Sequence, residues 1–300
     1  MPDCGGYAGK FLRVDLTNEK TSEVTFDEEL LRQYVGGAGI GAKILYEEVN
    51  SEADWSDPEN RLIYASGPLG GTRVGGSGSF SLVTKGALTN GATSVQANGL
   101  FGAYIKFCGY DGVIVQGAAS RWLYLNVNDH GVELREASYL LGRDTYETVD
   151  LLTEDLGKKA RQVSVISIGP AGEHQVKFAG VFAEKGHSAS HNGPGAVMGS
   201  KRLKAIAVSR GKEKVKVKDE ERLAKIVEEL YQNVKTFSGT VGGVYGSHMV
   251  GRGTLPIKNY LTNIWDISEE EIEGFSEEYV RKTYHPKANP CWACRLNHAT

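Results

Sequence analysis

Short segments with a strand pattern recur along the first 210 residues of the chain. Residues 11–16 alternate apolar and polar side chains, and a polar turn leads into residues 21–24, which is the pattern of a hairpin. Several other segments are short apolar runs of the kind that a sheet buries on both faces. The expected strands cover residues 11–16, 21–24, 62–65, 80–84, 113–115, 122–127, 132–135, 163–166 and 204–208. This pattern predicts a β-rich domain.

Helical spacing is confined to a few segments between these strands. Asp27 is a suitable N-cap for a short helix, and the glycine-rich residues 36–41 lead into a second one. A dinucleotide-binding turn is disfavoured at residues 36–41, because such a turn follows a strand and a helix precedes this one. A third, amphipathic helix is expected to start at Asp144 or Thr145 and to stop at Gly157.

A charged, extended segment at residues 212–219 divides the chain. After it, residues 220–234 repeat apolar side chains at helical spacing. A charged linker between segments of different character is typical of a domain boundary. We therefore expect one domain at residues 1–211 and the beginning of a mainly helical domain at residues 212–300.

The most unusual stretch is residues 67–112, which holds 12 glycines in 46 residues. A glycine inside a helix or strand costs roughly 0.5–1 kcal/mol relative to alanine, so this density predicts no helix here. Neutral polar side chains alternate with the glycines, and glycine leaves backbone amides open to a ligand. Such a surface suits a large polar ligand with phosphate groups. Tight turns in a β-rich region are the alternative explanation.

A second glycine-rich polar segment, residues 185–201, ends in an expected short helix. The motif Gly-Pro-x-Gly begins at Gly67 and again at Gly169, 102 residues later. This recurrence indicates two similar halves.

Composition narrows the class of protein. The net charge is −3 and the isoelectric point is near 6.2, so nothing indicates binding to nucleic acid. No apolar run approaches the roughly 18 residues that span a bilayer, and the N-terminus does not resemble a signal peptide. Four cysteines in 300 residues are too few for a disulfide scaffold. These features predict a soluble cytoplasmic protein.

The candidate chemistry lies at the C-terminal end. Cys291 and Cys294 form a C-x-x-C pair after Pro290, and His298 follows. This spacing lets ligands from one loop reach one metal centre, so it favours a thiolate-ligated metal or an iron–sulfur cluster. A thioredoxin-like redox pair is the alternative, although no βαβ pattern accompanies it. Cys108 is expected to be a buried, inert thiol.

Several short motifs occur in order along the chain. They are GKFLRVDL at 9–16, ASGPLGGT at 65–72, LVTK at 82–85, FGA at 101–103, KFCGYD at 106–111, IGPAGE at 168–173 and LKAI at 203–206. The most specific is GAVMGSK at residues 195–201. Through these motifs the chain resembles the N-terminal half of the tungsten-containing aldehyde:ferredoxin oxidoreductase family over essentially all 300 residues.

This resemblance implies an α+β fold. Its β-rich N-terminal domain consists of two sheets related by a pseudo-twofold axis, and the start of a mainly helical domain follows. The implied cofactor is a tungstopterin, in which two pterins hold one tungsten or molybdenum atom and Mg²⁺ bridges their phosphates. The cofactor-binding candidates carried over from the family are Ser79, Gln96, Asn98, Ser188, Ala189, His191 and Asn192.

The resemblance also assigns the cysteine pair to the loop of a 4Fe–4S cluster, with Cys291, Cys294 and His298 as metal ligands. The family has a third cysteine where His298 stands, and imidazole ligation raises the potential of such a cluster. Two further departures are Ser79, where the family usually has arginine, and Gln96, where it has asparagine. Losing an arginine–phosphate contact removes roughly 1.5–3 kcal/mol, and Arg73 is a nearby substitute.

The implied activity is oxidation of an aldehyde to a carboxylate, with electrons passing through the cluster to ferredoxin or to an iron–sulfur electron-transfer subunit. A low-potential reductase acting on an acyl-CoA-type substrate, of the benzoyl-CoA reductase type, is one alternative. A cofactor-binding scaffold without catalysis is another. The resemblance further implies a homodimer or a larger complex. The catalytic acid–base residues are expected in the half of the family sequence that follows this one.

Overall fold

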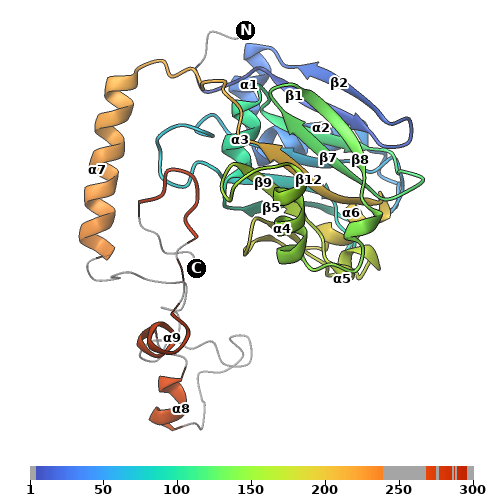
Figure 1. The fold of residues 1–300 in the computed structure, drawn as a ribbon. Helices are drawn as coiled ribbons and strands as arrows, with labels where there is room; N and C mark the ends of the chain where they lie inside the picture. The colour runs from blue at the N-terminus through green and yellow to red at the C-terminus, as the bar shows by residue number, and fades with distance from the viewer. Residues whose placement is uncertain (1–4, 239–267, 275–276, 286, 288, 296–300) are drawn as a thin grey trace.

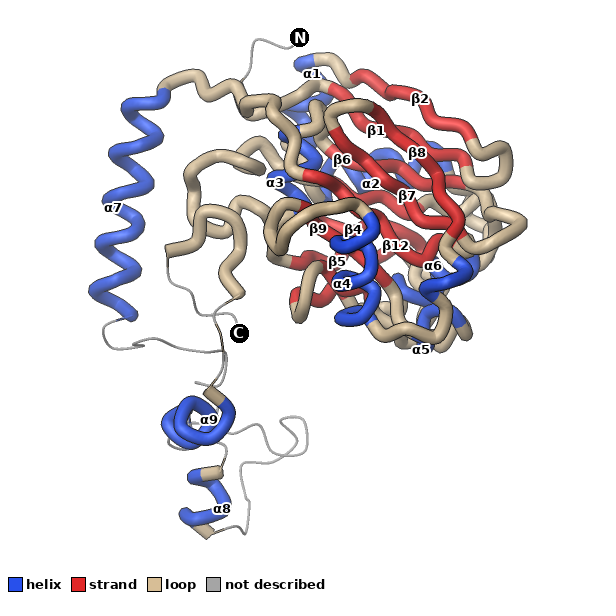
Figure 2. Tube along the Cα trace, viewed as in Figure 1, coloured by secondary structure: helices blue, strands red, loops and turns tan. Residues whose placement is uncertain are grey.

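The computed structural model describes residues 5–238, 268–274, 277–285, 287 and 289–295. Two six-stranded sheets form the main body (Figures 1 and 2). In spatial order the first sheet contains β2 (Lys20–Thr25), β1 (Lys10–Asp15), β6 (Gly112–Gln116), β3 (Leu62–Ala65), β4 (Phe80–Lys85) and β5 (Ala92–Ala97). The second contains β8 (Gly131–Glu136), β7 (Leu123–Asn128), β12 (Leu203–Ser209), β9 (Val163–Ser167), β10 (Val181–Ala183) and β11 (His187–Ala189).

The two sheets have the same topology. Each starts with a hairpin, β1–β2 or β7–β8, whose first strand pairs in parallel with the last long strand of its half. All other strand pairs are antiparallel. Both Gly-Pro-x-Gly motifs directly follow equivalent strands, β3 and β9. The α+β fold with two related sheets is therefore confirmed, and the recurrence of the motif reflects a duplicated architecture.

Successive side chains of the central strands lie on opposite faces and are buried on both, because the sheets are covered on each side. Tyr64 and Val113 point into the core between the sheets, whereas their neighbours Ile63 and Ile114 pack under helices on the outer face. The helices α1 (Glu28–Tyr34) and α2 (Ala38–Glu48) cover the first sheet, and α4 (Thr145–Asp155) covers the second. As expected, Asp27 caps α1 and Asp144 caps α4.

One expectation was wrong: the glycine-rich stretch contains a helix. All seven residues of α3 (Phe101–Phe107) are buried. Residues 101–107 contain only one glycine, Gly102. The glycine content averaged over 46 residues therefore concealed a short segment that can form a helix. The α6 helix (Pro194–Ser200) follows β11 as α3 follows β5, and both lie between the sheets. Sequence reasoning also missed β5 and the three-residue strands β10 and β11.

The remaining elements are helical. A short turn of 3-10 helix spans Ser138–Leu140, and α5 covers Pro170–Glu173. After residue 219 the described elements are α7 (Glu220–Ser238), α8 (Glu269–Glu273) and α9 (Glu277–Tyr284), and α7 stands apart from the sheets (Figure 1). None of the described helices is long and apolar enough to cross a membrane. The domain boundary at residue 212 stays a prediction.

Candidate metal and cofactor site

The tryptophan between the two cysteines fixes their loop to the sheets. The Trp292 N–H donates to the Gly99 carbonyl, and the Trp292 carbonyl accepts from the Gly76 N–H, each over 2.9 Å. The indole N–H donates to the Thr72 carbonyl, also over 2.9 Å. The ring packs edge-on against Phe107, with 5.1 Å between ring centroids. The cysteine loop, residues 289–294, is thus bound to the glycine-rich stretch at several points.

Two contacts from the other half hold the residues that precede Cys291. The Arg161 guanidinium donates to the Pro290 carbonyl over 2.9 Å. The Asn289 amide donates to the Lys185 carbonyl over 2.8 Å. The partners of Trp292 belong to the first half of the duplicated fold, whereas Arg161 and Lys185 belong to the second. The cysteine loop therefore joins both halves.

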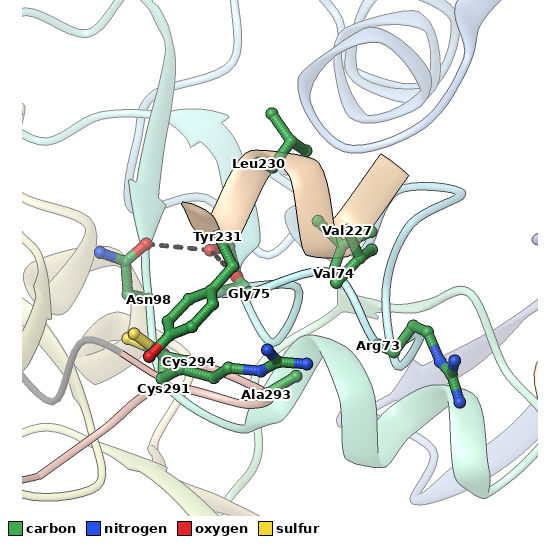
Figure 3. Close-up of a pocket in the computed structure, with 13 residues that line it drawn as sticks. Arg73, Val74, Gly75, Asn98, Val227, Leu230, Tyr231, Cys291, Ala293 and Cys294 are labelled. Atoms are coloured by element: carbon green, nitrogen blue, oxygen red, sulfur yellow. Dashed lines mark hydrogen bonds between the residues drawn. The ribbon is translucent and has the colours of Figure 1, made fainter. Parts of the chain in front are cut away.

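A cavity of about 420 Å³ lies between the cysteine loop, residues 73–76 and α7 (Figure 3). In the close-up, Asn98 and the two cysteines lie at one end of the cavity and Arg73 at the other. The Arg295 guanidinium lies 4.6 Å from the centre of the Tyr231 ring on α7, which links the cysteine loop to that helix. The lining residues are Arg73–Gly76, Ser79, Asn98, Val227, Leu230, Tyr231, Cys291 and Ala293–Arg295.

The glycine segment gives this cavity accessible backbone. A Cβ added to Gly76 would meet no atom within 4 Å, and the nearest atom to one on Gly75 lies 3.7 Å away. Within the described residues, the N–H groups of Arg73 and Gly75 have no protein hydrogen-bond partner. Two such donors next to an arginine suit an anion such as phosphate. This part of the glycine-rich stretch fits the phosphate ligand that the sequence predicts.

Other glycines in the stretch are required by packing. A Cβ on Gly78 would lie 2.0 Å from the Gly99 carbonyl oxygen, and one on Gly102 would lie 2.1 Å from the Ser79 carbonyl oxygen. Real Cβ atoms do not approach so closely, so only glycine lets these backbones meet. The high glycine content of residues 67–112 thus has two causes, of which ligand access is one.

Two of the predicted cofactor-binding residues lie in the cavity beside the cysteines. The Ser79 hydroxyl is 2.9 Å from Asn98 Oδ1 and 2.8 Å from the Gly76 carbonyl oxygen, and both oxygens accept its hydrogen bond. These contacts orient Ser79 and Asn98 in the lining of the cavity. The structure therefore brings Ser79 and Asn98 together with Cys291 and Cys294.

The other predicted cofactor residues lie outside the cavity lining. Gln96 is exposed on β5 and Ser188 is exposed on β11, and these two edge strands run side by side. The Ala189 side chain is buried, and His191 is exposed in the turn that follows β11. Gln96 and Ser188 thus contribute neutral polar side chains to the edges at which the two sheets meet. Their role in cofactor binding stays a prediction.

The Asn192 side chain is already engaged by the protein. Its Oδ1 accepts hydrogen bonds from the Thr89 N–H over 3.0 Å and from the Thr89 hydroxyl over 3.1 Å. Its φ is +64°, a conformation that asparagine tolerates better than most residues. Thr89 lies in the turn between β4 and β5, so Asn192 links the two halves. This side chain has a structural role, whatever its part in cofactor binding.

The cysteine pair satisfies part of the requirement for a metal centre. Cys291 is buried, Cys294 is partly buried, and both are free thiols. Burial raises the pKa of the Cys291 thiol, which disfavours a bare thiolate and favours one neutralised by a metal. Within the described residues no three His, Cys, Asp or Glu side chains gather at one point. His298, the third predicted ligand, lies outside the described residues. The pair thus fits a centre completed by ligands from other segments.

Sequence reasoning missed a buried carboxyl group beneath the cysteine loop. The Ser164 hydroxyl donates to Glu184 Oε1, and Oε2 has no hydrogen-bond partner among the described residues. A Cβ on Gly99 would lie 2.1 Å from Oε2, so Glu184 packs directly under the backbone that binds Trp292. Burial raises the pKa of Glu184 to about 7. A single Glu between a strand and a turn gives no sequence signal for such a position.

Cys108 lies away from the cavity, as expected for an inert thiol. It is partly buried, and its Sγ is 3.2 Å from the Ser209 carbonyl oxygen. Burial raises its pKa to about 12, so this thiol stays protonated at neutral pH.

Comparison with known proteins defines the class. The sequence model described as "Aldehyde ferredoxin oxidoreductase, N-terminal domain" matches residues 11–210, which are two thirds of the chain and include both sheets. The chain therefore belongs to the aldehyde ferredoxin oxidoreductase family, as the sequence motifs implied.

Individual relatives show how similar this chain is to known proteins. The chain is 38% identical to the tungsten-containing aldehyde ferredoxin oxidoreductase of Pyrococcus abyssi, over 97% of this chain and 48% of that protein. It is 32% identical to a Pyrococcus furiosus protein named aliphatic sulfonate oxidoreductase, WOR-like subunit, over 93% and 47% of the two chains. A solved structure, the active site complex BamBC of benzoyl coenzyme A reductase with 1,5-dienoyl-CoA, matches with a TM-score of 0.86 and 28% identity, over 98% and 47%. The chain spans about half the length of these relatives.

Proposed function

We propose that this chain forms the cofactor-binding half of a tungsten bis-pterin oxidoreductase that oxidises aldehydes to carboxylates and passes electrons through a 4Fe–4S cluster. The observation that supports this most directly is the shared cavity. Ser79, Asn98 and the open amides near Gly75 face the same space as Cys291 and Cys294. Anion donors and thiols beside one cavity suit a phosphate-bearing cofactor next to a redox centre.

Each part of the site has a distinct task in this proposal. The N–H groups of Arg73 and Gly75 would bind the phosphates, and the side-chain oxygens of Ser79 and Asn98 would face the phosphate-bound Mg²⁺. The polar edges of β5 and β11 would extend this surface. Cys291 and Cys294, together with His298, ligate the cluster. When bound, the tungstopterin supplies the two-electron chemistry at the substrate. The apolar side of the cavity, formed by Val227, Leu230 and Tyr231 of α7, limits access of water to this region.

A low-potential reductase acting on an acyl-CoA-type substrate is the second candidate. The BamBC complex, which was solved with 1,5-dienoyl-CoA, matches almost this entire chain with a TM-score of 0.86. The fold is thus compatible with either direction of electron flow. A cofactor-binding scaffold without catalysis is a further alternative, because Ser79 stands where the family usually has arginine.

Metal analysis of the full-length protein tests the proposal. We expect about one tungsten or molybdenum atom and about four iron atoms per chain, with aldehyde-dependent reduction of a viologen dye. Both metals without aldehyde oxidation, but with dye-driven reduction of an aromatic acyl-CoA, would support the reductase instead. Absence of both metals from protein produced in tungsten-supplemented cells would leave only the scaffold. We further expect His298→Ala to lower the iron content, and unchanged iron with an unchanged cluster spectrum would contradict its role as a ligand.

The partners follow from the same proposal. A ferredoxin or an iron–sulfur subunit would accept the electrons. Assembly as a homodimer or within a larger complex, in the cytoplasm, is part of the proposal as well.

A further inference from the structure

A second cavity is lined in part by residues that pack against Trp292 of the cysteine loop. It has a volume of about 550 Å³, and Arg73 lines both cavities. Phe107 and Arg210 form part of its wall. Both pack against Trp292: the Phe107 ring centre is 5.1 Å from the Trp292 ring centre, and the Arg210 guanidinium is 5.0 Å from it. Trp292 directly follows Cys291 in the chain, so two wall residues of this cavity contact the cysteine loop.

The rim of this cavity carries a concentration of positive charge. Residues 210–218 hold five basic residues and one acidic residue, in a chain whose net charge is −3. Four exposed cations line the cavity: Arg73, Arg210, Lys212 and Lys214, which we call the basic surface. The exposed Glu213 and Glu220 also line it, so the cations remain in excess. None of the four forms an ion pair or a side-chain hydrogen bond with the described residues. The charge is therefore available to a partner.

The segment that carries these charges is fixed to the sheets. The Glu213 N–H donates to the Phe107 carbonyl over 3.0 Å, and the Gly6 N–H donates to the Lys216 carbonyl over 2.7 Å. The Lys212 N–H donates to Asp129 Oδ1 over 3.1 Å. Backbone bonds to three different parts of the sheet domain hold the basic surface in one place, unlike a freely moving linker. The family model ends at residue 210, so Lys212 and Lys214, two of the four basic residues, lie beyond the family match.

We infer that the basic surface docks an acidic iron–sulfur electron-transfer protein, such as a ferredoxin, next to the cysteine loop. This inference rests on the proposed function and specifies where its partner binds. Complementary charge steers such encounters and fixes their orientation. Oxidation of one substrate molecule releases two electrons, and two successive one-electron reductions of the partner's cluster account for them. The contact between this cavity's wall and the cysteine loop favours an electron-transfer protein over nucleic acid as the polyanion that binds here.

The test measures binding of a clostridial-type 2[4Fe–4S] ferredoxin to the full-length holoenzyme. The variant Lys212→Glu/Lys214→Glu reverses two charges that do not contact the cysteine loop. We expect it to raise the dissociation constant at low ionic strength by about tenfold or more and to flatten the dependence of binding on salt. Its aldehyde oxidation with a small viologen dye should equal that of the unaltered protein.

The matched control is Lys20→Glu/Lys177→Glu. These exposed lysines lie on β2 and after α5, at the end of the molecule away from α7 (Figure 1). An equal loss of affinity in the control, or no loss in the test variant, overturns the inference. Acetylation of surface lysines gives an independent measurement. Ferredoxin should protect Lys212 and Lys214 of the full chain from acetylation. The inference is contradicted if these two lysines cannot be acetylated in the free protein, or if they are acetylated equally with and without ferredoxin.

Further outcomes separate this inference from the proposed function. If the protein contains both metals and oxidises aldehydes with the dye but binds ferredoxin independently of Lys212 and Lys214, the docking surface is wrong and the function stands. If the metals are absent, the function fails and the docking inference falls with it. Displacement of ferredoxin by a short DNA duplex at equal charge concentration would show a general polyanion surface and would also overturn the inference.

Discussion

At the scale of single residues, the fold strongly perturbs the ionisation of Glu184, which lies next to the backbone that binds the cysteine loop. Burial raises its pKa from 4.5 to about 7, so the folded protein holds a proton that the unfolded chain releases. Between pH 4.5 and 7 the folded state therefore binds more protons, and its stability falls as the pH rises. The full effect above pH 7 is about 3 kcal/mol, since each pKa unit corresponds to about 1.4 kcal/mol.

Glu184→Gln tests this assignment. The amide cannot ionise, so the variant should lose the fall in unfolding free energy between pH 4.5 and 7 and should be the more stable protein at pH 8. Urea unfolding at a series of pH values measures this. Glu154→Gln, an exposed substitution on α4, is the control and should keep the slope of the unaltered protein. Parallel pH profiles for Glu184→Gln and the unaltered protein would show that Glu184 is not a proton-holding group.

Single residues also mark what sequence reasoning can and cannot locate. Spacing indicates Cys291 and Cys294, and family motifs indicate Ser79 and Asn98. The structure places all four at one cavity, and their roles stay predictions. Trp292, Arg161 and Glu184 carry no local signal, because each acts through a partner more than 15 residues away. Contacts between distant segments define this site, and a pattern within one segment does not report them.

At the scale of elements, the cysteine loop depends on one aromatic anchor. Trp292 is bound by three hydrogen bonds and packs against Phe107 and Tyr104. Truncating a fully buried aromatic side chain typically costs about 3–5 kcal/mol, and the cost at the partly buried Trp292 should be smaller. We expect Trp292→Ala to release residues 289–294 from the sheets, which would raise amide hydrogen exchange in this loop and in residues 72–79 without unfolding the sheets.

Trp292→Phe separates the two kinds of contact. It keeps the ring packing and removes only the indole N–H bond to Thr72, so its effect on hydrogen exchange should be smaller than that of alanine. Equal exchange in all three proteins would mean that other contacts hold the loop. A rise spread over both sheets after Trp292→Ala would instead mean that Trp292 supports the whole domain and does not act as a local anchor.

Elements also explain which parts of the fold the sequence predicts. Strands such as β3, β6 and β9 are buried on both faces and appear as apolar runs, so their positions were correct to within about a residue. By contrast, β5 alternates exposed and buried residues with little apolar contrast, and β10 and β11 have three residues each. α3 was missed because buried backbone contacts, and not a turn, require the glycine within it.

At the scale of the whole molecule, the two sheets share one core. The main buried cluster takes residues from both halves, and the Tyr64 hydroxyl on β3 donates to Met198 Sδ on α6 over 3.3 Å. Neither inner face has another surface to cover it in the part of the chain that the structure describes. We therefore expect the halves to unfold together.

A fragment of residues 1–211 makes this measurable, because it holds one tryptophan in each half, Trp55 and Trp122. In Trp55→Phe and Trp122→Phe versions of the fragment, fluorescence reports one half at a time. Their urea midpoints, each compared with circular dichroism of the same protein, should coincide with the far-ultraviolet transition. Two separated midpoints would show that the halves are independent, and failure of the fragment to fold would contradict the predicted boundary at residue 212.

The repeated strand order has a consequence for how a ligand is held. Because β5 and β11 occupy equivalent places in their sheets and run side by side, the molecule offers the same backbone framework twice along one seam. A compound with two matching arms would find a corresponding position for each arm. The side chains on β5 can vary independently of those on β11 while the backbone of both strands stays the same. The same fold can therefore hold a compound whose two arms differ.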